Sequence, residues 1–235
     1  MRLRSMIALA LVAGLVAPSV AAAQDTRPGV GIFAFDNGGS YGQEAEDFEA
    51  LQVGLQQMLI GDLAGNSGLR LVERGRIQQL LDEQDLGAGG RVDANTAAQI
   101  GRLIGARYMI FGSFIDFYGD FRLDARIVDG ETGEVIKTDR ARGPREDLFS
   151  ILQDLADNIP DGLELPALSA RDRQTQQESR ERLGQANPEA VRAYMRGLLY
   201  QDRGDNERAA ELFSQAIEAF PAYHEAREAL NQVSE

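Results

Sequence analysis

The chain has 235 residues, a formal net charge of −13 and no cysteine. The excess of carboxylates argues against nucleic acid or an anionic lipid surface as a partner, because like charges repel. Without cysteine we expect neither disulfides nor a lipid anchor on an N-terminal cysteine, so any attachment to a membrane should be through other proteins.

The first 23 residues have the pattern of a secretory signal peptide. Arg2 and Arg4 precede an apolar run at 6–16, Pro18 interrupts that run, and small residues lead to a cleavage site after Ala23. The run is too short for a membrane-spanning helix, which needs about 20 apolar residues. We therefore expect export to the periplasm and no direct membrane insertion. Any association with the outer membrane would be through proteins.

Residues 30–163 alternate between strand-like and helix-like patterns. Short apolar or alternating runs predict strands, whereas apolar residues spaced by three and four predict helices. The expected strands are 30–36, the start of 69–87, 107–119, 121–129 and 135–142; the expected helices lie in 46–68, the rest of 69–87, 93–106 and 148–159. The strand at 135–142 is polar enough to be an edge. This order predicts an α/β (α+β) fold in which helices sandwich a mixed β-sheet.

The C-terminal part predicts a separate all-α segment. Residues 166–187 are highly charged, which is typical of either a linker or a solvated helix. A second apolar pattern then begins at 188, where Pro188 suits the first position of a helix. We therefore divide the chain into a signal peptide (1–23), an α/β domain (28–165), a charged linker or helix (166–187) and a helical hairpin (188–235).

Residues 189–221 resemble a tetratricopeptide repeat. The residues on its spacing are Gly197, Tyr200, Gly204, Ala209, Phe213, Ala216 and Pro221. Ala193 and Arg196 depart from the repeat, which favours large apolar residues there. The resemblance implies that the first helix lines a groove, where Tyr194, Leu198 and Gln201 would bind a partner. The alternative is that these three residues pack on the preceding helix or the α/β domain, because one repeat cannot bury its face alone.

The α/β part resembles the curli-secretion CsgG-like domain, which is related in shape to the N-terminal domain of TolB. The resemblance is carried by "VGIFAFDN", the helix with Leu55 and Leu59, "LRLVERGRIQQLLDEQ", "AAQIGRLIGARYMIFGSF" and "LDARIVDGETGEVI", in order over most of 30–140. It implies protein partners and a possible homo-oligomer. Pore-forming members insert hairpins into the membrane, but the hairpin at 107–128 is charged on one face and needed in the sheet. We therefore do not expect a pore.

No group of residues indicates catalysis. The acids Asp116, Asp120, Asp124 and Asp129 could act in pairs or hold a cation, but they lie in turns or beside arginines. The single histidine, His224, rules out a serine triad or a histidine-rich metal site on inventory. We therefore expect no enzyme activity, no metal and no cofactor.

Two functional hypotheses remain. The first is a non-catalytic envelope scaffold that binds protein partners and is accessory to outer-membrane secretion or assembly. The alternative is a periplasmic small-ligand-binding protein or hydrolase that uses the sheet edge near Asp36 and Glu73, because ligands often bind at strand ends in α/β folds. The corner at Glu73 and Arg74 lacks a Gly-rich phosphate loop, which favours a structural role with local pairing of these two residues.

Overall fold

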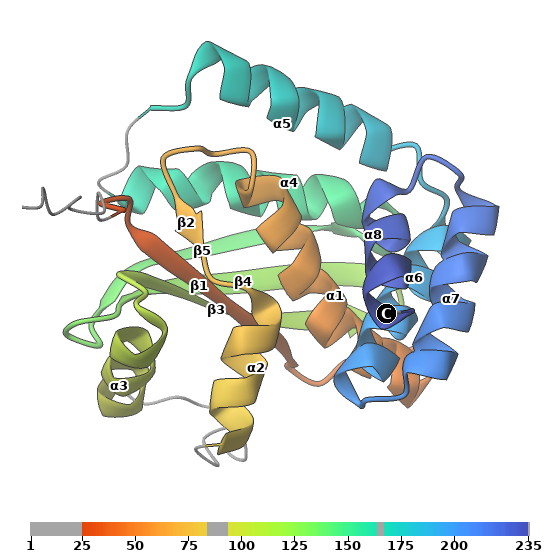
Figure 1. Ribbon diagram of the computed structural model, residues 1–235, viewed down its shortest axis with the longest axis horizontal. Coiled ribbons are helices and arrows are strands. Elements are labelled where there is room, and N and C mark those ends of the chain that lie inside the picture. Colours follow the sequence, from red (N-terminus) through yellow and green to blue (C-terminus); the bar gives the residue numbers. More distant parts are fainter. Residues whose placement is uncertain (1–24, 84–93, 164–166, 235) are drawn as a thin grey trace, which may run out of the picture.

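The structure, a computed structural model, describes residues 25–83, 94–163 and 167–234 (Figure 1). The predicted signal peptide and its cleavage site lie outside these residues. The elements are β1 (Gly29–Asn37), α1 (Ala45–Leu63), β2 (Arg70–Leu71), α2 (Arg74–Glu83), α3 (Ala94–Ile104), β3 (Tyr108–Phe117), β4 (Asp120–Asp129), β5 (Val135–Pro144), α4 (Leu148–Asn158), α5 (Ala170–Leu183), α6 (Pro188–Asp202), α7 (Asn206–Ala219) and α8 (His224–Val233), with short 3₁₀ turns on either side of α4. Over this part of the chain, every helix is too short or too polar to cross a membrane.

The five strands form one mixed sheet in the order β2-β1-β3-β4-β5. β1 is parallel to β2 and β3, whereas β3, β4 and β5 form an antiparallel meander. The predicted fold class and the edge position of β5 are confirmed. β2 is shorter than the sequence predicts: only Arg70 and Leu71 pair with β1, because the chain turns into α2 at Arg74.

Helices cover both faces of the sheet, but unequally. On one face, α1 and α4 pack on Ile110, Phe114 and Phe121 in the larger apolar cluster. On the other face, α2 and α3 pack on Met109 and Phe111. β3 is therefore buried on both sides near its start, as its apolar run predicts. Beyond Phe111 the second face carries charged residues of β4 and β5, among them Asp124, Arg126 and Arg140, so the helical sandwich is complete over only part of the sheet.

The charged segment after α4 contains a helix rather than only a linker. Ser169 caps α5 by accepting a hydrogen bond from the backbone N–H of Asp172, and α5 has no buried residue. Arg180 donates to both carboxylate oxygens of Asp62 at the end of α1, at 2.6 and 2.7 Å. This hydrogen bonding raises the pKa of the Arg180 guanidinium. Polar contacts, not an apolar core, therefore hold α5 on the α/β domain.

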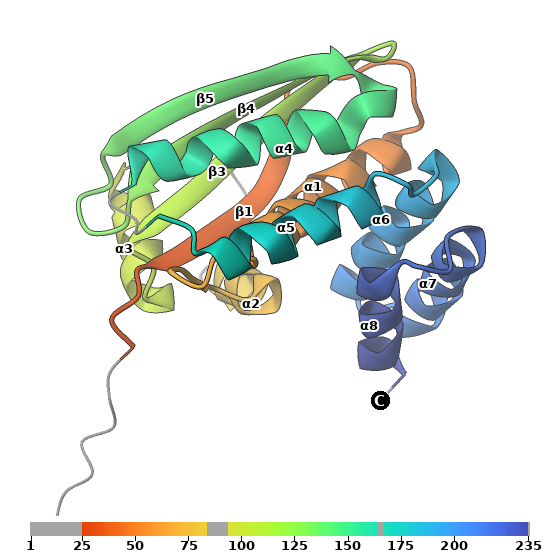
Figure 2. The same ribbon diagram turned by 90° about the horizontal axis from the view of Figure 1, so that it is seen from above.

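Helix α6 belongs to two apolar clusters at once. Val191, Met195 and Leu199 join the cluster of α1 and α4, and a methyl group at Gly54 of α1 would clash with Met195. The opposite side of α6 packs on α7 and α8. Figures 1 and 2 show the three helices stacked beside α1. The α/β domain thus covers the face that a single repeat unit cannot bury.

Inside the helical segment, Gly197, Tyr200 and Phe213 have the contacts that the repeat spacing predicts. Gly197 lets α7 approach so closely that any side chain there would clash with the Phe213 ring. Tyr200 is partly buried against the cluster of α6, α7 and α8, and its hydroxyl also donates to Glu46 of α1, at 2.5 Å. Arg196, where the repeat favours leucine, also forms an ion pair with Glu46. The departure from the repeat pattern therefore serves contact with the α/β domain.

Candidate functional site

A cleft of about 830 Å³ lies between the α/β domain and the helical segment. It is lined by residues of α1, α2, α6 and α8 and by Glu73. The helical residues of the lining include Arg74, Tyr194, Leu198, Gln201, Asp202, Glu225 and Glu228. The corner at Glu73 and Arg74 and the three predicted partner residues, far apart in the sequence, therefore meet in one place.

The three predicted partner residues differ in how far they reach into this cleft. Tyr194 and Leu198 are each only 3% exposed. The Tyr194 ring packs against Phe213 and Tyr223, with centroids 5.9 and 4.8 Å away. Gln201 is half-buried and accepts a hydrogen bond from Nη2 of Arg74, at 3.3 Å. Most of the Tyr194 and Leu198 side chains thus belongs to the helical core, and only their edges face the cleft.

Arg74 joins the two parts of the protein. Its guanidinium forms an ion pair with Asp202 at the end of α6. The predicted local pairing of Arg74 with Glu73 is therefore wrong: a carboxylate from the helical segment takes its place. The backbone carbonyl of Glu73 instead accepts the first hydrogen bonds of α2, from the N–H groups of Arg76 and Ile77.

The lining of the cleft is acidic. Among the residues that the structure describes, its charged residues are five carboxylates and one guanidinium, namely Glu73, Glu83, Asp202, Glu225, Glu228 and Arg74. Burial raises the pKa of the Tyr194 hydroxyl, and the nearby charge of Glu225 raises it further. Tyr194 is thus a neutral hydrogen-bonding group at physiological pH.

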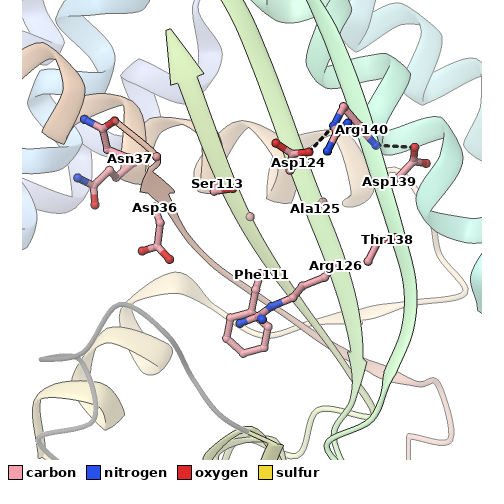
Figure 3. Close-up of a pocket in the computed structure, with 13 residues that line it drawn as sticks. Asp36, Asn37, Phe111, Ser113, Asp124, Ala125, Arg126, Thr138, Asp139 and Arg140 are labelled. Carbon is pink, nitrogen blue, oxygen red and sulfur yellow. Dashed lines mark hydrogen bonds and ion pairs between the residues drawn. The ribbon is translucent and has the colours of Figure 1, made fainter. Parts of the chain in front are cut away.

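A second hollow lies on the polar face of the sheet, beside the end of β1 (Figure 3). The charged and aromatic residues at its floor interact with one another. Asp124 forms ion pairs with Arg122 and Arg140, and Arg126 lies over the Phe111 ring, 5.2 Å from its centroid. Asp36 lines this hollow.

The alternative site at the sheet edge is not formed as a unit. Asp36 faces the hollow on the sheet, whereas Glu73 lines the cleft beside the helical segment. The two are separated because β2 pairs only with the first residues of β1, at Gly29 and Val30, so Glu73 is not level with the end of β1. The expected pairing of these two acids in one ligand site is therefore wrong.

The four candidate acids of the meander all have structural partners. Asp116 is fully buried and accepts hydrogen bonds from Gln43 at 2.7 Å, from Arg145 at 2.6 Å and from the N–H of Gly119 at 2.8 Å. Asp124 is in the ion pairs already described.

The remaining two acids close turns or pair across strands. Asp120 pairs with Arg142, and this hydrogen bonding lowers the pKa of Asp120. Asp129 closes the hairpin turn by accepting from the N–H groups of Glu131 and Thr132. His224 is exposed at the start of α8. In the described ranges, no three His, Cys, Asp or Glu side chains are grouped so that they could hold a metal ion.

Sequence reasoning missed an exposed group of aromatic rings at the tip of the β3–β4 hairpin. Tyr41, Phe117 and Tyr118 are 59%, 59% and 72% exposed. Phe117 lies edge-on to both neighbours, with centroids 6.1 Å from Tyr41 and 5.3 Å from Tyr118. We call these three residues the aromatic corner. The signal was the sequence "DFYGD", because tight turns normally carry small or polar residues.

The structure thus defines a class of protein: a mixed-sheet α/β domain that shares its core with a repeat-like helical segment. Residues 17–122 match the family described as "Curli production assembly/transport component CsgG". The predicted resemblance of the α/β domain to CsgG-like domains is confirmed. This match supports the broad class of envelope-associated proteins.

Three solved structures illustrate the structural similarity. The C-terminal domain of LpoB from Salmonella enterica is 18% identical, with a TM-score of 0.39, over 50% of this chain and 83% of that chain. TolB from Acinetobacter baumannii is 13% identical, with a TM-score of 0.41, over 60% and 29%. Lipoprotein GNA1162 from Neisseria meningitidis is 11% identical, with a TM-score of 0.40, over 57% and 98%. No curated protein matches the chain.

Proposed function

We propose that this protein is a non-catalytic scaffold of the cell envelope, which is exported to the periplasm, binds protein partners and is accessory to outer-membrane secretion or assembly. The single observation that carries the proposal is the CsgG family match, which spans β1 through the start of β4. The structural pairing of all four candidate acids supports the non-catalytic part. The division into residues 1–23, 28–165, 166–187 and 188–235 is part of the same proposal.

The aromatic corner supports a role in binding proteins. Tyrosine and phenylalanine are enriched in protein interfaces, and rigid aromatic residues often dominate binding energy. Here the support is rigid, because the buried Asp116 ties the hairpin to Gln43 and Arg145. Tyr118 also has φ 53°, in the left-handed region that favours glycine. This backbone conformation costs a residue other than glycine about 1–2 kcal/mol. The large ring at this position therefore suggests that Tyr118 serves contact with a partner rather than stability.

The proposal is tested best with surface variants. Deleting residues 188–235 would remove Val191, Met195 and Leu199 from the shared core and disturb the whole protein. We instead expect the double variant Phe117→Ser, Tyr118→Ser to fold normally but to form no envelope complexes in the native host.

Leu103→Ser is the matched control, because Leu103 is an exposed apolar residue on α3, outside the aromatic corner. Native gels of envelope extracts would show the complexes, and light scattering of residues 24–235 over a concentration series would show whether another copy is a partner. The proposal fails if the double variant assembles and supports envelope function as the unsubstituted chain does.

A further inference from the structure

Two side chains in the cleft each have an oxygen atom without a hydrogen-bond partner among the described residues. Tyr194 lines the cleft and is 97% buried, yet its hydroxyl makes no hydrogen bond to any residue that the structure describes. Glu225 accepts through Oε1 from Arg182, at 2.6 Å, whereas its Oε2 and the Nε of Arg182 are both buried without a partner among the same residues. Buried polar atoms in native proteins are nearly always hydrogen-bonded. A ligand that donates hydrogen bonds would satisfy both oxygen atoms.

The charges of the cleft select the sign of that ligand. Among the described residues of the lining, Arg74 is the only cation, and its ion pair with Asp202 already neutralises it. Glu73 and Glu228 form no ion pair within the described part of the chain. An acidic ligand would therefore be repelled, whereas a lysine or arginine would find several carboxylates and a phenol oxygen as acceptors.

The shape and apolar lining fit a chain segment rather than a small ion. The space of about 830 Å³ is much larger than one side chain, and Ile60, Leu198 and Ala229 line it beside the carboxylates. The aliphatic stem of a lysine or arginine can pack on such residues while its charged end reaches the acids. The cleft is therefore suited to basic side chains carried on an extended backbone.

We propose that the cleft between α2 and the α6–α8 segment binds an extended, lysine- or arginine-rich segment of a partner protein, with a basic side chain donating to Tyr194 and Glu225. This inference rests on the proposed scaffold function, since it names the chemistry of one partner. It is independent of the aromatic corner.

The first probe is a short fluorescent peptide of alternating lysine and glycine, titrated into residues 24–235 at low salt. A peptide of the same length with glutamate in place of lysine is the ligand control. We expect the lysine peptide to bind and the glutamate peptide not to bind. We also expect affinity to fall as salt rises, because ionic screening weakens contacts between exposed charges.

Two variants then localise the binding. Glu73→Gln with Glu228→Gln removes two carboxylates that are in no ion pair and should weaken binding about tenfold or more. Glu207→Gln with Glu218→Gln removes the same charge from exposed positions on α7 and should have little effect. Tyr194→Phe deletes only the hydroxyl and should weaken binding without loss of thermal stability.

The inference is overturned if the lysine peptide fails to bind, if both peptides bind equally, or if the α7 variant loses as much affinity as the cleft variant. The two proposals can fail separately. Intact envelope complexes in the Glu73→Gln, Glu228→Gln variant, together with their loss in the Phe117→Ser, Tyr118→Ser variant, would reject the basic segment and leave the scaffold function standing.

Discussion

Met195 offers a direct test of the shared core between the α/β domain and the helical segment. It is 3% exposed on α6, and its side chain packs among residues of α1 and α4 and against Gly54. Met195→Ala would remove most of that side chain and leave a cavity between α1 and α6. Such truncations destabilise proteins by about 2–5 kcal/mol. In a protein of this size, 1 kcal/mol changes Tm by about 2–4 °C, so we expect a fall on the order of 10 °C.

The assay must report on both parts of the protein. Thermal unfolding followed by far-UV circular dichroism should show one transition at the lowered Tm. Hydrogen exchange should show that protection falls together in α1 and in α7, although α7 does not contain the substitution. Leu103→Ala is the control, since Leu103 is 47% exposed and its truncation should change Tm very little. Two separate transitions, with exchange in α1 unchanged, would refute the shared core.

Three further predictions follow from single residues. Tyr118→Gly should raise the free energy of unfolding by about 1 kcal/mol in urea titrations, because glycine tolerates the left-handed backbone; a loss of stability would contradict the strain. Asp116→Ala should lower it by about 2–3 kcal/mol, because buried hydrogen bonds to a carboxylate are lost, and an unchanged urea midpoint would rule out this role. The hydrogen bond from Tyr200 and the charge of Arg196 lower the pKa of Glu46 below 4.5, so this contact stabilises the fold above that pH and is lost as the pH falls through the lowered pKa. In the Glu46→Gln variant, the free energy of unfolding should therefore fall less steeply as the pH is lowered. An equally steep fall would show that Glu46 does not contribute to the pH dependence.

Local patterns in the sequence were enough to predict most elements of the fold. The alternation of Phe121, Leu123, Ala125 and Ile127 against charged neighbours predicted β4 and its buried face, because successive side chains of a strand point to opposite sides. The spacing of small and aromatic residues likewise predicted the close contact of α6 with α7 at Gly197. These features depend on residues close together in the chain.

Features that depend on distant contacts were missed. Arg196 was interpreted as a defect of the repeat, but its partner Glu46 lies 150 residues earlier in the chain. Arg74 was expected to pair with its neighbour, yet it pairs with Asp202, 128 residues away. Nothing in a local pattern indicates which distant carboxylate will lie near an arginine. The cleft and its acidity follow from the packing of α6 on α1, so they emerge only from the structure.

Photo-crosslinking in the envelope of the native host would test whether this protein works by binding other proteins through defined surfaces. A photoreactive residue would replace Tyr118 in the aromatic corner, Glu228 in the cleft or, as a control, the exposed Gln174 on α5. We expect discrete crosslinked species from positions 118 and 228 and none from position 174. The same weak, diffuse labelling from all three positions would contradict this expectation.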